Sequence, residues 1–296
     1  MNSFLSSIGF SNVRRERDME KILDLVTRKY TERQAVRKEK ETAFVEYSKE
    51  FGPGIGITVC GELDEEGFHR EYYYPYFRGT GISTQEDLVV EKHGGKNSYA
   101  GVVEDMRVGI SLIFFVQNNC QYLKAVKNLN LLNQPISTTF SGLANKGMIL
   151  LPVCKSEEQR QYDQEASQKR SSLISAARNG DEEAIESLTL EDMDTYTMIS
   201  QRIHEEDIFS IVDTFLMPHG LECDQYQVMG EIKSIDIKYN EWTKEKLYQM
   251  KLSCNDIEFD VCINAKNLLG EPEIGRRFKG NIWLQGNINF PEEKAC

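Results

Sequence analysis

YQMKLSCNDIEFDVCI, residues 248–263, is the segment that decides the fold of the last quarter of this 296-residue chain. Apolar and polar residues alternate on both sides of Asn255-Asp256, and such short polar residues favour a tight turn. With a two-residue turn there, Cys254 pairs with Ile257, and the apolar side chains of both strands fall on one face. The segment therefore predicts a β-hairpin with one buried face.

The hairpin belongs to a β-rich stretch, residues 225–290, that we predict to close into a small barrel. Downstream of the hairpin, RFKGNIWLQG (residues 277–286) is a strand punctuated by glycines. Glycine within a strand is typical of the bends and bulges at which a small barrel turns a corner. In strand count the barrel is similar to the oligonucleotide/oligosaccharide-binding (OB) fold, a likeness that does not by itself fix a function.

The first half of the chain also reads as mainly β. Turn residues separate its apolar runs, and the short loops between them favour antiparallel pairing. Helices are predicted over residues 18–30 and 119–128, and strands over 43–51, 55–63, 67–77, 87–93, 108–117 and 146–153. The fold class is therefore α+β. We expect three parts: an antiparallel sheet domain with an N-terminal helix (1–154), an acidic helical connector (155–206) and an OB-like β-barrel (207–296).

The acidity of the chain is concentrated in one block. Of a net charge of −12, residues 155–222 contribute most, with 16 Asp and Glu against 6 Lys and Arg. An acidic surface repels phosphate backbones and attracts basic protein partners. We therefore disfavour nucleic acid and expect another protein as the partner. The candidate partner-binding residues are Asp181, Glu182, Glu183 and Glu186.

The acidic block contains residues that are typical of helix starts and ends. Gly180 is placed to end a first helix and Asp181 to cap a second. Thr189 is expected to open a third helix that directs Met193 and Tyr196 inward.

Cysteine usage and hydropathy favour a cytoplasmic protein. Seven cysteines at irregular spacing fit reduced thiols better than a disulfide framework. No apolar run approaches the ~18 residues of a membrane span, and no charged leader precedes the few apolar residues at the N-terminus. We expect no membrane association, and the sequence leaves the oligomeric state open.

One aromatic cluster stands out as a candidate ligand surface. In the predicted strand over 67–77, alternation directs Tyr72, Tyr74 and Tyr76 to one face. Tyrosines on a sheet can stack a base or a sugar, but they also cover sheet surfaces and contact other proteins. The candidate ligand-binding residues of the barrel are Arg276, Arg277 and Trp283.

The sequence gives little support for a metal site or for a catalytic nucleophile. His219 and Cys223 are four residues apart, yet the chain has no pair of Cys-x-x-Cys knuckles. Cys60 and His69 come within range across a predicted hairpin, without a third residue to orient them. We therefore expect neither a metal nor a cofactor, and no catalytic residue is assigned.

Four segments carry a resemblance to a known family. They are residues 4–10 (FLSSIGF), 176–199 (AARNGDEEAIESLTLEDMDTYTMI), 217–226 (MPHGLECDQY) and 270–286 (GEPEIGRRFKGNIWLQG). The chain resembles a family of cytoplasmic proteins from anaerobic Gram-positive bacteria, the domain-of-unknown-function family DUF3881. This resemblance implies a compartment but supplies no catalytic residue.

Three hypotheses of function follow. The first is a non-enzymatic interaction or regulatory module that uses the acidic helical surface. The second is binding of single-stranded nucleic acid or oligosaccharide by the barrel. The third is an enzyme of unrecognised type, which would need a deep pocket lined by ionisable groups.

Overall fold

The computed structural model describes residues 3–13, 15–38, 42–94, 97–128, 135–153, 157–202 and 207–291. The chain forms two compact units, and the first is discontinuous in sequence. It combines Met1–Leu150 with Leu216–Cys296, whereas Leu151–Phe215 form the second unit. The sheet domain and the barrel domain that we expected to be separate are thus parts of one unit.

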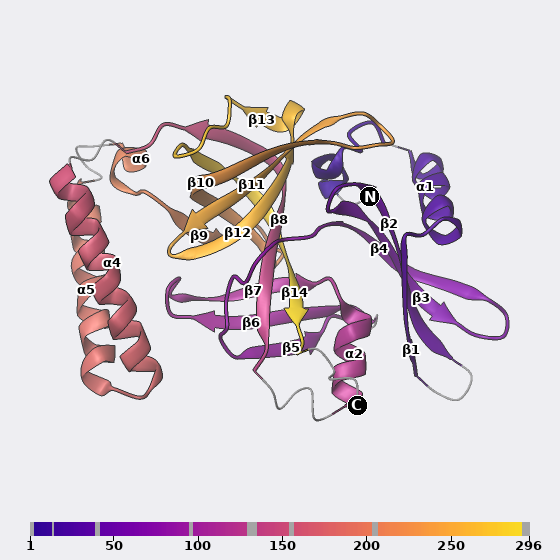
Figure 1. The fold of residues 1–296 in the computed structure, drawn as a ribbon, viewed down its shortest axis with the longest axis horizontal. Helices are drawn as coiled ribbons and strands as arrows, with labels where there is room; N and C mark the ends of the chain where they lie inside the picture. The colour runs from indigo at the N-terminus through magenta and orange to yellow at the C-terminus, as the bar shows by residue number, and fades with distance from the viewer. Residues whose placement is uncertain are drawn as a thin grey trace. The chain divides into compact units, whose positions relative to one another are not determined.

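An antiparallel four-stranded sheet, here called the N-terminal sheet, lies in the first unit (Figure 1). Its strands follow sequence order and pair as hairpins, which confirms the antiparallel prediction. The sequence did not predict the first strand, whose residues ERQAVR lack an apolar alternation. The strands are β1 (Glu32–Arg37), β2 (Ala43–Gly52), β3 (Ile55–Leu63) and β4 (Phe68–Phe77).

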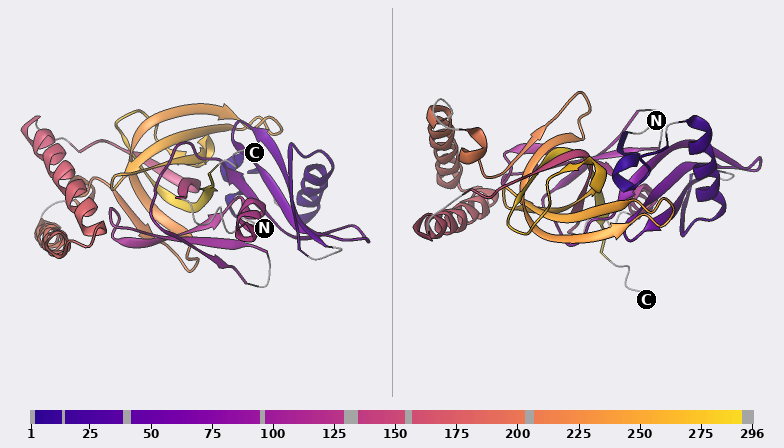
Figure 2. Two further views of the ribbon diagram at one scale, coloured as in Figure 1. Left: turned by 60° about the horizontal axis from the view of Figure 1, so that its bottom comes forward. Right: turned by 90° about the horizontal axis from the view of Figure 1, so that it is seen from above.

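Helices cover the two sides of this sheet (Figures 1 and 2). Helix α1 (Glu16–Arg28) buries one apolar face and contacts β2 and β3. Helix α2 (Asn119–Lys127) contacts β1 and β2 from the other side. Both helices lie where the sequence predicts them. A 3-10 helix, η1 (Ser3–Ile8), precedes α1 and contacts the strands β8 (Ser137–Leu150) and β12 (Ile257–Asn264).

Five strands close into a barrel in the same unit (Figure 2). Around the barrel the order is β8, β12, β11, β10 and β14, and β14 pairs again with β8. Two glycines allow close packing inside: a Cβ on Gly147 or Gly280 would lie 2.4 or 2.6 Å from the ring of Phe278. The bounds are β8 (Ser137–Leu150), β10 (Gln225–Tyr239), β11 (Lys246–Cys254), β12 (Ile257–Asn264) and β14 (Arg277–Asn289).

The predicted hairpin is confirmed residue by residue. Cys254 pairs with Ile257 and Leu252 with Phe259. Asn255 and Asp256 both have positive φ, as a two-residue hairpin turn of this kind requires. The inward-facing apolar side chains of both strands belong to the core inside the barrel, whereas Leu247 and Cys262 belong to the other core cluster of the unit.

Strand β8 corrects the predicted domain boundary. The sequence places a strand over 146–153 at the end of the sheet domain, but β8 begins at Ser137 and is a strand of the barrel. Its parallel pairing with β12 joins residues more than 100 positions apart in the chain. Residues 207–296 therefore do not close the barrel alone. The sequence did not predict this, because no local pattern reveals a strand partner so distant in the chain.

Shorter elements complete the first unit. Strands β5, β6 and β7 form an antiparallel meander that extends the barrel sheet, because β7 pairs in parallel with the end of β14. Strand β6 was not predicted. These elements are β5 (Leu88–Lys92), β6 (Tyr99–Asp105), β7 (Ile110–Val116), β9 (Phe215–Pro218), η2 (Ala265–Asn267) and β13 (Leu268–Leu269).

The second unit is a helical hairpin. Helix α4 (Glu157–Arg178) packs against α5 (Glu182–Arg202), and α6 (Ile208–Ile211) is a single turn. The prediction of a third helix at Thr189 is wrong, because the Thr189 hydroxyl donates to the Ile185 carbonyl inside a continuous α5. Met193 and Tyr196, predicted inward, are 61% and 75% exposed. None of the described helices has the length and apolar character that crossing a bilayer requires.

Candidate functional site

One face of the N-terminal sheet carries polar side chains in register across its strands. Glu32, Ser48, Thr58 and Tyr74 form one cross-strand row. The neighbouring row contains Gln34, Glu46, Cys60 and Tyr72. This face is polar because alternate residues of β2 and β3 are polar, whereas the residues between them pack toward α1.

Most residues of these two rows form the floor of a pocket of about 180 Å³, whereas Cys60 and Tyr72 do not line it. Its wall consists of residues at the start of α2 and one residue of β14. We call it the sheet pocket. Its lining residues are Glu32, Gln34, Glu46, Ser48, Thr58, Tyr74, Tyr76, Arg78, Gln117, Asn118, Gln121 and Asn287.

Glu46 is the buried acid of the sheet pocket. Its carboxyl accepts hydrogen bonds from the Asn119 side-chain amide (3.2 Å) and from the Cys120 backbone N–H (3.1 Å). Both donors belong to the first turn of α2, where a negative charge is favourable. Burial nevertheless dominates and raises the pKa of Glu46 to about 7. The group can therefore change its charge near neutral pH.

The three predicted tyrosines do share the pocket face, but their hydroxyls differ. Tyr72 donates to the Asn97 carbonyl (2.7 Å) and Tyr74 to the Gln117 carbonyl (2.6 Å). The Tyr76 hydroxyl, by contrast, is buried without a hydrogen-bond partner among the described residues. The side chain of Tyr76 is only 3% exposed in total.

A second orphaned atom lies beside Glu46. The side-chain carbonyl oxygen of Asn119 is buried and has no partner in the described parts of the chain. An unpaired buried polar atom costs about 1–3 kcal/mol. Two such atoms, one in the pocket lining and one next to its buried acid, therefore mark a region that is not optimised for stability alone.

An ion pair crosses the polar face. Arg78, just after β4, pairs with Glu32 of β1 at 2.5 Å, and its guanidinium lies 5.3 Å from the centre of the Tyr76 ring. Because β1 and β4 are the two edges of the sheet, the pair bridges the whole face. Burial alone would raise the pKa of Glu32, but hydrogen bonds from Gln34 and Arg78 outweigh it and lower that pKa.

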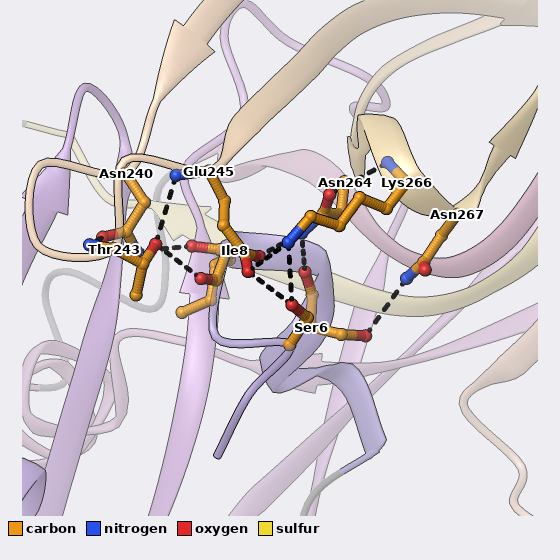
Figure 3. A network of polar contacts seen from close by, with 10 residues as sticks. Ser6, Ile8, Asn240, Thr243, Glu245, Asn264, Lys266 and Asn267 are labelled. Atoms are coloured by element: carbon orange, nitrogen blue, oxygen red, sulfur yellow. Dashed lines mark hydrogen bonds and ion pairs between the residues drawn. The ribbon is translucent and has the colours of Figure 1, made fainter.

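In a second polar cluster, the side chains hydrogen-bond to one another and to the backbone (Figure 3). Asn240 donates to the Ile8 carbonyl (2.7 Å), and the buried Glu245 accepts from Asn264 (2.6 Å) and Lys266 (2.7 Å). Burial opposes ionisation of Glu245, yet these hydrogen bonds lower its pKa. These hydrogen bonds connect the N-terminal segment to the barrel strands. Because the polar groups are already paired, the cluster favours a structural role.

The candidate ligand-binding residues of the barrel do not form one exposed surface. Trp283 is 8% exposed; its indole donates to Asp224 (2.7 Å) and its ring packs on Phe4 and Phe115. Arg277 is buried as well, and Arg276 pairs with Glu273 (2.7 Å). Trp283 thus belongs to the core that also contains residues of η1, α1 and the N-terminal sheet, and Arg277 is withdrawn from the surface.

The predicted partner-binding acids lie at the start of α5. Asp181 accepts hydrogen bonds from the backbone N–H groups of Glu183 (3.0 Å) and Ala184 (3.2 Å), so it caps the helix as predicted. Glu182, Glu183 and Glu186 are exposed on α5.

The cysteines and histidines of the described ranges do not converge on one site. Cys60 is buried, with its pKa raised well above the usual value by that burial, and it pairs with Tyr72 rather than with His69. His69 instead contacts Asp64 at 3.2 Å. His219 contacts Asn281, while Cys223 is exposed. Among the described residues, no group of three His, Cys, Asp or Glu side chains could hold a metal ion.

The sequence reasoning missed the acid and the ion pair of the sheet pocket. Glu46 and Ser48 occupy alternate positions in β2, and the preceding residue Val45, on the opposite face, is buried. Polar residues at alternate positions normally indicate a solvated face. That Glu46 is buried depends on α2, which comes more than 70 residues later.

The fold and the pocket define this chain as an α+β protein with a small barrel and a polar pocket on a separate sheet. A family model described as "Domain of unknown function, E. rectale Gene description (DUF3881)" matches residues 5–286, so the chain belongs to this family. The family predicted from the sequence is thereby confirmed. No curated protein and no solved structure matches the chain.

Proposed function

We propose that this chain binds a small polar molecule in the sheet pocket. The main support is the Tyr76 hydroxyl, which is buried in the pocket lining and has no hydrogen-bond partner in the described part of the chain. Burying it unpaired costs about 1–3 kcal/mol, a cost that a ligand able to hydrogen-bond it would remove. The buried Glu46 adds a group that can accept or donate a hydrogen bond as it titrates near pH 7.

Native mass spectrometry of the full chain tests this proposal. The protein is incubated with a metabolite mixture and examined for an added small-molecule mass. Gln121→Trp places a bulky ring at the exposed rim of the pocket, and Val126→Trp places the same ring elsewhere on α2. A bound mass should be lost in the first variant and kept in the second. A mass that both variants retain would locate the ligand outside the pocket.

Binding of a protein partner by the helical hairpin is a second candidate. Its support is the exposed side chains of Met193 and Tyr196 on a helix that also carries Glu182, Glu183 and Glu186. We propose a basic partner in the cytoplasm. Lysine in place of the three glutamates should abolish partner capture in a pull-down, with the Asp181 cap left intact. Unchanged capture would remove the acidic surface from consideration.

Binding of single-stranded nucleic acid or oligosaccharide by an OB-like barrel has weaker support. Arg277 and Trp283, two of the residues expected to make those contacts, are buried. Oligonucleotide binding that weakens steeply with salt would restore this candidate.

A further inference from the structure

The charges around the sheet pocket limit what can bind there. Arg78 is the one cationic side chain in the lining, and the ion pair with Glu32 neutralises it. An anion entering the pocket would meet two carboxyl groups and no unpaired cation among the lining residues. Transfer of an uncompensated charge into such a site is strongly unfavourable. Phosphates and carboxylates are therefore poor candidates.

The sheet pocket does not require a positively charged ligand either. Glu46 titrates near neutral pH, so a large fraction of the molecules holds it uncharged. Both carboxyl oxygens of Glu46 already accept N–H donors from α2. The pocket as a whole carries little net charge, which matches a neutral ligand.

The polar atoms of the lining have the pattern that hydroxyl groups match. Ser48 and Thr58 hydrogen-bond each other (2.8 Å) and Tyr74 donates to the Gln117 carbonyl, so these three hydroxyls keep mainly acceptor lone pairs, whereas the Tyr76 hydroxyl is without a partner among the described residues. The side-chain N–H groups of Gln117 and Asn118 already donate within the protein. A ligand hydroxyl can accept from Tyr76 and donate to a neighbouring hydroxyl oxygen, whereas a purely donating or purely accepting group makes only one of these bonds.

The pocket volume sets the size of the ligand. At about 180 Å³ it lies below the ~300 Å³ at which sites for drug-sized ligands begin. It corresponds to roughly six water molecules at their share of liquid volume, ~30 Å³ each.

We propose that the ligand of the sheet pocket is a neutral molecule with several hydroxyl groups, of monosaccharide size or smaller, and that Tyr76 hydrogen-bonds one of them. The inference rests on the proposed function of this pocket and narrows it to a ligand class. Tyr76 is then the residue that selects for a hydroxyl at one position of the ligand. An analogue without that hydroxyl leaves the Tyr76 group unpaired and is rejected.

Ligand-observed NMR on the full chain tests the class with three probe sets. The first contains glycerol, D-ribose, D-glucose and myo-inositol; the second contains inorganic phosphate, acetate and succinate; the third contains ethanolamine and putrescine. Wild type is compared with Tyr76→Phe, and with Tyr239→Phe as the matched loss of an exposed hydroxyl on β10. Glu32→Gln tests the ion pair, because it leaves Arg78 without its carboxylate partner.

The expected result is binding of a hydroxylated probe to wild type and to Tyr239→Phe. Tyr76→Phe should weaken it roughly 5- to 150-fold, which is 1–3 kcal/mol expressed as affinity. Glu32→Gln should gain binding of phosphate or succinate. Hydroxylated probes that bind Tyr76→Phe as tightly as wild type would overturn the role of Tyr76.

Two further outcomes separate the ligand class from the pocket function. If phosphate or an amine binds wild type and is displaced by Gln121→Trp while the hydroxylated probes stay silent, the class is wrong and the pocket function stands. If no probe of any set binds in a way that Gln121→Trp abolishes, and the purified chain carries no small molecule, both proposals fall.

Discussion

Replacing Tyr76 by phenylalanine should make the ligand-free protein more stable. The Tyr76 hydroxyl is buried and has no hydrogen-bond partner in the described structure, so the folded state bears its desolvation without compensation. Removing that atom recovers about 1–3 kcal/mol. The phenyl ring remains, so the contact with Arg78 is kept. The variant should therefore gain stability while it loses the proposed ligand.

The neighbouring tyrosines are matched controls on the same strand. The hydroxyls of Tyr72 and Tyr74 donate to the carbonyls of Asn97 and Gln117. Phenylalanine at either position removes a satisfied hydrogen bond, so it should cost about 1 kcal/mol. Three identical chemical changes on one face are thus expected to differ in sign, according to whether each hydroxyl has a partner.

Urea unfolding followed by tryptophan fluorescence provides the assay. Both tryptophans, Trp242 and Trp283, belong to the first unit, so their emission reports on the unit that contains the pocket. A gain of 1 kcal/mol raises the midpoint by roughly 0.3–1 M urea for slopes of about 1–3 kcal/mol/M. A Tyr76→Phe midpoint at or below that of wild type would show that the buried hydroxyl does not destabilise the folded state.

Three further predictions concern other parts of the chain. Burial holds the pKa of Glu46 at about 7 against its usual 4.5. The folded state therefore binds the extra proton, and stability should fall by about 3 kcal/mol as pH rises from 4.5 to 7. Glu46→Gln should abolish this fall in urea titrations at pH 5 and pH 8, and an unchanged pH dependence would contradict the assignment. Trp283→Phe should destabilise the first unit by about 1–3 kcal/mol, because Asp224 loses its indole donor; affinity for a sheet-pocket probe should not change. Asp181→Ala should cost the α5 helix about 0.5–2 kcal/mol as measured by amide hydrogen exchange, whereas Glu186→Ala should have little effect.

Local patterns predicted those elements whose partners are close in the sequence. The register of the β11–β12 hairpin followed from the alternation around Asn255-Asp256, and the caps of α5 followed from Asp181. The strand β1 escaped prediction because its own residues carry no apolar alternation, and pairing with β2 supplies its order. Thr189 was misread as a cap because the same hydroxyl can bond inside a helix.

The candidate site was predicted only in part. Alternation correctly placed Tyr72, Tyr74 and Tyr76 on one face, since neighbouring positions in a strand point to opposite sides. It could not distinguish the orphaned hydroxyl of Tyr76 from the satisfied ones of its neighbours. Their partners, the carbonyls of Asn97 and Gln117, come from loops more than 20 residues away.

The α+β class, the acidic helical block, the barrel hairpin and the family could all be predicted from the sequence, because each depends on residue types at short spacing. Tertiary structure alone decided that β8 completes the barrel and that Glu46 is buried beneath the start of α2. Both results depend on contacts between distant segments. Burial, and with it the pKa of an acid or the cost of an unpaired hydroxyl, is set by those contacts and not by neighbours in the chain.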